Sequence, residues 1–61
     1  MEARTTIQNR IARYEIELQM VWGILDANRD ADNAGGVKYW TERRDEVIAK
    51  MSALREILQE I

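Results

Sequence analysis

The sequence predicts an all-α protein: a coiled-coil-like, antiparallel two-helix hairpin that assembles into a homodimeric four-helix bundle or a higher homo-oligomer. Four observations predict this class. Proline is absent, and apolar residues recur every three or four positions in two long stretches. A polar run, DANRDADNAGG at 26–36, separates these stretches. The apolar residues also outnumber those that two paired helices can bury.

The first helix is expected over about 3–28. Its apolar side chains follow alternating steps of four and three, which is the a/d pattern of helices that pack along one seam. They are Ile7, Ile11, Tyr14, Leu18, Val21 and Leu25.

A loop at about 29–36 and a second helix over about 37–60 complete a single hairpin domain, 1–61. Asp, Asn and Gly dominate the polar run and favour turns. The apolar residues of the second helix have the same spacing, and this stripe extends toward the loop to include a charged residue and an aromatic one. It comprises Trp40, Arg44, Val47, Met51, Leu54, Leu58 and Ile61.

A short connection places neighbouring helices antiparallel. Facing residues then have position numbers with a constant sum, here 65, which sets Leu18 against Val47 and Ile11 against Leu54. Arg44 faces Val21 in this register. Its stem can pack while the guanidinium reaches Asp45, Glu46 or solvent, or a polar seam residue can fix register or partner choice.

A second apolar set predicts self-association. A domain of this size buries only about 60% of its unfolded surface, and the absence of Cys and His excludes disulfides and the usual zinc sites. A C2 dimer is the commonest assembly. The oligomer interface is expected at Ala12, Ile16, Met20, Ile24, Ile48 and Ile57.

Aromatic and basic residues gather toward the loop end of the hairpin and form a candidate binding site. It contains Trp22, Lys38, Tyr39, Trp40, Arg43 and Arg44, with Trp22 expected beside Arg43. These residues either pack structurally or form a hot spot for a partner or an anionic ligand such as a nucleotide.

The polar run also offers a calcium alternative. Asp26, Asn28, Asp30 and Asp32 occupy alternate positions, like the first ligands of an EF-hand loop. The match fails where Ala31 replaces the required Gly and where Val37 replaces the bidentate Glu. We therefore expect no metal and no cofactor.

The remaining features exclude other classes of function. Without His, Cys or a phosphate-binding glycine loop, catalysis is not expected. The net charge of −2 gives no pull toward nucleic acid or membranes, although an RNA-binding four-helix bundle stays an alternative. With no apolar leader and no membrane span, a cytoplasmic location is expected.

The sequence thus predicts a small, non-enzymatic interaction protein. We expect it to self-associate and to bind a larger, unidentified protein as an inhibitor, adaptor or assembly factor, of the kind that phages and mobile elements encode. The first alternative is an oligomer that sequesters a small anionic ligand.

Overall fold

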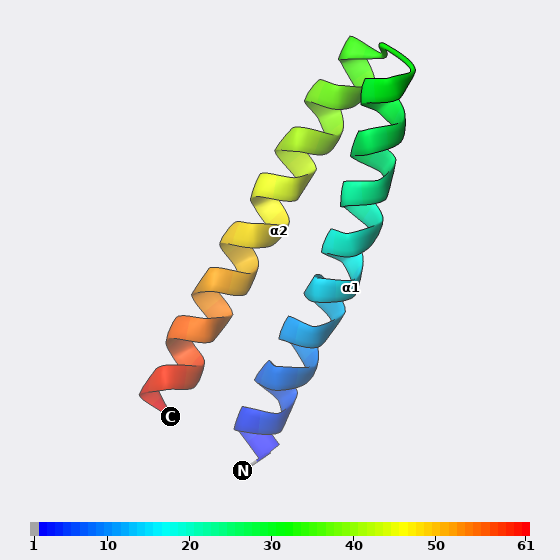
Figure 1. Cartoon of the computed structure of the whole chain (residues 1–61). Helices are drawn as coiled ribbons and strands as arrows, with labels where there is room; N and C mark the ends of the chain where they lie inside the picture. Colours follow the sequence, from blue (N-terminus) through cyan, green and yellow to red (C-terminus); the bar gives the residue numbers. More distant parts are fainter. Residues whose placement is uncertain (1) are drawn as a thin grey trace.

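The computed structural model describes residues 2–61 and consists of two long helices, α1 (Glu2–Asp30) and α2 (Ala34–Glu60). The helices run antiparallel and side by side, with both chain ends at the same end of the molecule (Figure 1). The whole measures 46 × 15 × 11 Å. The predicted all-α hairpin is confirmed, whereas Met1 of the predicted domain 1–61 lies outside the described residues.

One seam between the helices forms the core, and it follows the predicted stripes. All five apolar side chains that are buried among residues 2–61 belong to these stripes: Ile11, Val21, Leu25, Val47 and Met51. Most other seam residues are half-buried, namely Ile7, Tyr14, Leu18, Trp40, Arg44, Leu54 and Leu58. Only Ile61, at the end of the chain, is exposed. Burial therefore confirms the two predicted stripes as the seam along almost the whole length of the hairpin.

The connection is shorter than the predicted loop at 29–36, because α1 continues to Asp30 and α2 already begins at Ala34. Two hydrogen bonds end α1: the backbone N–H of Asp32 donates to the carbonyl of Arg29, and that of Asn33 donates to the carbonyl of Asn28. This pair is the Schellman arrangement, in which one residue takes a left-handed conformation. Asp32 does so, with φ 55°.

Asn33 then starts α2 directly. Its side-chain oxygen accepts a hydrogen bond from the backbone N–H of Gly36 at 3.2 Å, and its amide donates to Oδ1 of Asn28 at 2.9 Å. Asn28 in turn donates to the carbonyl of Ile24 at 2.8 Å. Residues that composition assigned to the loop therefore cap and join the helices.

The two adjacent glycines at the start of α2 have different roles. A Cβ on Gly36 would overlap the side-chain oxygen of Asn28 and lie 2.7 Å from its Cγ, whereas a Cβ on Gly35 would meet only the Asn33 oxygen at 3.8 Å. Only Gly36 is required by a close approach between the two helices.

We expect Gly36→Ala and Gly35→Ala to change stability in opposite directions. Gly36→Ala should lower the free energy of unfolding by about 1 kcal/mol or more, because it displaces the Asn28 side chain. Gly35→Ala should raise it by up to about 1 kcal/mol through helix propensity. Urea denaturation followed by circular dichroism, at one fixed protein concentration, measures both. Equal effects of the two changes would contradict the close approach at Gly36.

Candidate functional site

An uncovered apolar strip runs along α1 on the face opposite the seam. Ile16 and Met20 are 61% and 63% exposed there, and Gly23 and Ala27 continue the line at steps of three and four residues. We call these four residues the outer stripe. Nothing lies within 4 Å of a Cβ placed on Gly23, so the space beside the stripe is open. Exposed apolar side chains in such a row indicate a surface for a partner.

The structure does not bring the six predicted interface residues onto one surface. Ala12, Ile16 and Met20 are exposed along α1, and Ile24 beside them is half-buried. The remaining two, Ile48 and Ile57, lie nine residues apart on α2. Nine residues correspond to two and a half helical turns, so these two side chains lie on opposite sides of that helix.

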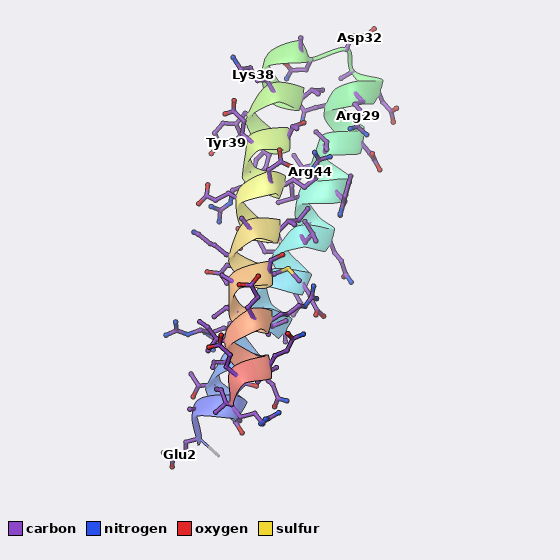
Figure 2. The ribbon with its side chains drawn as sticks, turned by 90° about the vertical axis from the view of Figure 1, so that its left-hand side faces the viewer. Glu2, Arg29, Asp32, Lys38, Tyr39 and Arg44 are labelled. Carbon is purple, nitrogen blue, oxygen red and sulfur yellow. The ribbon has the colours of Figure 1, made fainter. Side chains whose placement is uncertain are left out.

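The six residues of the predicted binding site are also divided among separate places. Tyr39 and Arg43 line one shallow hollow, Trp22 lines a groove with Ile48, and Lys38 lies with Arg29 at the hairpin end. In Figure 2, Tyr39 points outward from α2 whereas Arg44 reaches toward α1. The residues are neighbours along the chain, but they do not converge on one pocket.

Arg44, and not the predicted Arg43, lies over the Trp22 ring. Its guanidinium carbon is 5.2 Å from the ring centroid, and Nε and Nη2 donate to one carboxylate oxygen of Asp45 at 3.1 and 2.9 Å. The predicted contact with Asp45 is confirmed. Arg44 faces the apolar seam, so its guanidinium extends out of the seam along one side. Trp22, the residue after Val21, lies on that same side.

Arg43 lies on the other side of α2, between two carboxylates. It forms ion pairs with Glu17 of α1 and with Glu46, the latter at 3.2 Å. The hydrogen bond and charge of Glu17 raise the pKa of Arg43 further above its ordinary value. Beside it, the Tyr39 and Trp40 rings meet edge to face, with centroids 5.0 Å apart.

Sequence reasoning missed the ion pairs that flank the seam on both sides. Glu17 pairs with Arg43 on one side, and Glu15 pairs with Arg55 at 3.3 Å on the other. Each of these residues directly precedes or follows a seam position of its own helix. In antiparallel helices such flanking positions face each other, so the register already held the information needed to predict the pairs.

The calcium alternative loses its geometric basis. Asp26, Asn28 and Asp30 lie within α1 and not in a loop, so side chains at alternate positions point in different directions. Asn28 is already hydrogen-bonded to Asn33, and Asp26 forms an ion pair with Arg29 at 3.7 Å. Among residues 2–61, no three acidic side chains lie close enough together to hold a metal ion.

Comparison of the chain with protein-family models, with curated proteins and with solved structures gives no match. Neither helix in residues 2–61 is long and apolar enough to cross a membrane.

The two ion pairs across the seam should differ in strength. The side chains of Glu17 and Arg43 are about one-third exposed, and those of Glu15 and Arg55 about one-half. Glu17→Gln should lower the free energy of unfolding by up to about 1 kcal/mol, and Glu15→Gln by less, because water screens the more exposed pair. Urea denaturation measures both, with Glu42→Gln as an exposed control. A larger loss for Glu15→Gln would contradict this ranking.

Acid should weaken the contacts of Glu46. Its pKa is lowered by a hydrogen bond and charge from Lys50, at 3.0 Å, and by the charge of Arg43. A carboxylate with a lowered pKa stabilises the fold above its ordinary value of 4.5, and this contribution is lost as the pH falls through the lowered value. Glu46→Gln should therefore flatten the decline of Tm between about pH 5 and pH 3. An unchanged decline would contradict the contribution of Glu46.

Proposed function

We propose that this protein is a non-enzymatic interaction module that self-associates through the outer stripe of α1. In this proposal it acts by occupying a surface on a larger protein, as an inhibitor, adaptor or assembly factor. The observation that carries the proposal is the exposure of Ile16 and Met20 on the face of α1 opposite the seam.

A helix with apolar side chains on two opposite faces is typical of the interior of a bundle. The seam of α1 is covered by α2, whereas the opposite face has no cover within the hairpin. Burying a Met or Ile side chain contributes roughly 1.5–3 kcal/mol, which is large beside the small net stability expected of so short a chain. Self-association would bury these side chains against a second copy of the same chain and so add this stabilisation.

A surface remains for a larger partner after the outer stripe is covered. Trp22 and Ile48 are each 40% exposed and line a groove on one side of the seam. Tyr39 is 62% exposed near the hairpin end. Aromatic side chains beside arginine are the groups that most often dominate protein interfaces, so these residues are our candidates for contact with the partner.

The arginines give less support to the sequestering of an anionic ligand. Arg43 is held between Glu17 and Glu46, and Arg44 is held by Asp45. Three carboxylates thus already surround two guanidinium groups. A nucleotide phosphate would have to displace these contacts, and we therefore rank this function below protein binding.

Sedimentation equilibrium at micromolar concentration tests the proposal. The wild-type chain should sediment as an oligomer, whereas Ile16→Glu/Met20→Glu should give the monomer mass of 7.2 kDa with its helix content retained. The matched control is Ala49→Glu/Ala53→Glu, which places the same charges at the same spacing on an exposed face of α2 and should leave the oligomer intact. A wild-type monomer with a stable fold would overturn the proposal.

A further inference from the structure

The exposed face of α1 is ordered along its length in a way that makes it self-complementary. The outer stripe continues by one step at each end, to Arg13 before Ile16 and to Asp30 after Ala27. From N to C the extended stripe therefore reads basic, large, large, small, small, acidic. All six residues are exposed, and among residues 2–61 neither Arg13 nor Asp30 forms an ion pair.

Such an order matches itself when two copies of α1 pack antiparallel. With a twofold axis between the levels of Val21 and Trp22, Met20 faces Gly23 of the second copy and Ile16 faces its Ala27. Arg13 faces the Asp30 of the second copy. Every large side chain then meets a small one, and each charge meets its opposite.

Two other ways of pairing the same stripe are poorer. In a parallel pair each residue faces its own copy, so Arg13 would oppose Arg13 and Asp30 would oppose Asp30. Shifting the antiparallel pair to the next alignment sets Ile16 against Met20 and Arg13 against Gly23. That alignment crowds the large side chains together and leaves the arginine opposite no carboxylate.

Gly23 supports the first alignment independently. Glycine is unfavourable inside a helix, and nothing within the hairpin lies within 4 Å of the position of its missing side chain. The hairpin therefore gives no reason for glycine at this position. A second helix that brings a methionine against the backbone there would give one.

We infer that two copies of this chain pair through antiparallel α1 helices, with Met20 of each copy seated on Gly23 of the other and Arg13 paired with Asp30. The inference rests on the proposed self-association and specifies its orientation and register.

A size exchange tests the register. Gly23→Leu should raise the Kd of the dimer by about tenfold or more, because the introduced side chain would collide with Met20 of the second copy. Helix content should not fall, since the space beside Gly23 is open in the hairpin. Met20→Ala/Gly23→Leu should return the Kd to within about threefold of the wild-type value, because large and small side chains have changed places. Sedimentation equilibrium gives these constants, with Gly23→Ala as the control for helix propensity.

The outcomes separate this inference from the proposed function. If the wild type is a monomer, the proposed function and this inference both fail. If the wild type is a dimer but Gly23→Leu leaves its Kd unchanged or lowers it, self-association stands and the register is overturned. Failure of Met20→Ala/Gly23→Leu to restore the dimer, with its helix content intact, would also overturn the register.

Disulfide trapping tests the orientation, and the absence of Cys from the chain makes it direct. A mixture of chains carrying Ile16→Cys and chains carrying Ala27→Cys should form disulfide-linked heterodimers on oxidation, because these positions face each other. Each variant oxidised alone should stay unlinked. Efficient linking of Ile16→Cys to itself would indicate parallel helices and overturn the inference.

Discussion

Two helices that pack side by side can each bury only one stripe of side chains, and this constraint governs the whole molecule. The seam uses that capacity fully: Leu25 and Val47 are completely covered, and Val21 nearly so. Apolar side chains on the face of α1 opposite the seam have no neighbour within the hairpin to cover them. The exposure of Ile16 and Met20 is therefore a consequence of the two-helix architecture, and it links the fold directly to the need for a further surface.

The seam could be predicted because the same spacing recurs in both helices, and all five apolar residues that are buried among residues 2–61 lie on the predicted stripes. The ends of the helices could not be predicted, because composition assigns a polar run to a loop but does not show which hydrogen bonds that run forms. Asn28 donates a hydrogen bond within α1, and Asn33 caps α2. Gly36, which has no side chain, allows the Asn28 side chain of α1 to approach the start of α2 closely. These roles depend on local geometry that the residue types alone leave open.

The candidate sites were only partly predictable for a related reason. A spacing of four kept Ile16 and Met20 on one line of α1, but nearness in sequence did not bring the predicted binding residues together. Arg43 and Arg44 are adjacent, yet neighbours on a helix point about 100° apart. Arg43 consequently meets Glu17 and Arg44 meets Trp22, on different sides of the seam. The Asp45 partner of Arg44 was among those predicted, whereas the Glu17 partner of Arg43 follows from the register but was missed.

The unfavourable residues of the hairpin gather at one level. Arg44 enters the seam opposite Val21 and must send its charge out past Trp22, and Gly23 interrupts the exposed face of α1 within the next turn. Neither residue improves the apolar packing between α1 and α2. The twofold axis of our proposed dimer falls at this same level, where Met20 of a second copy would cover Gly23. Residues that weaken an isolated hairpin would then be the ones that shape its contact with another.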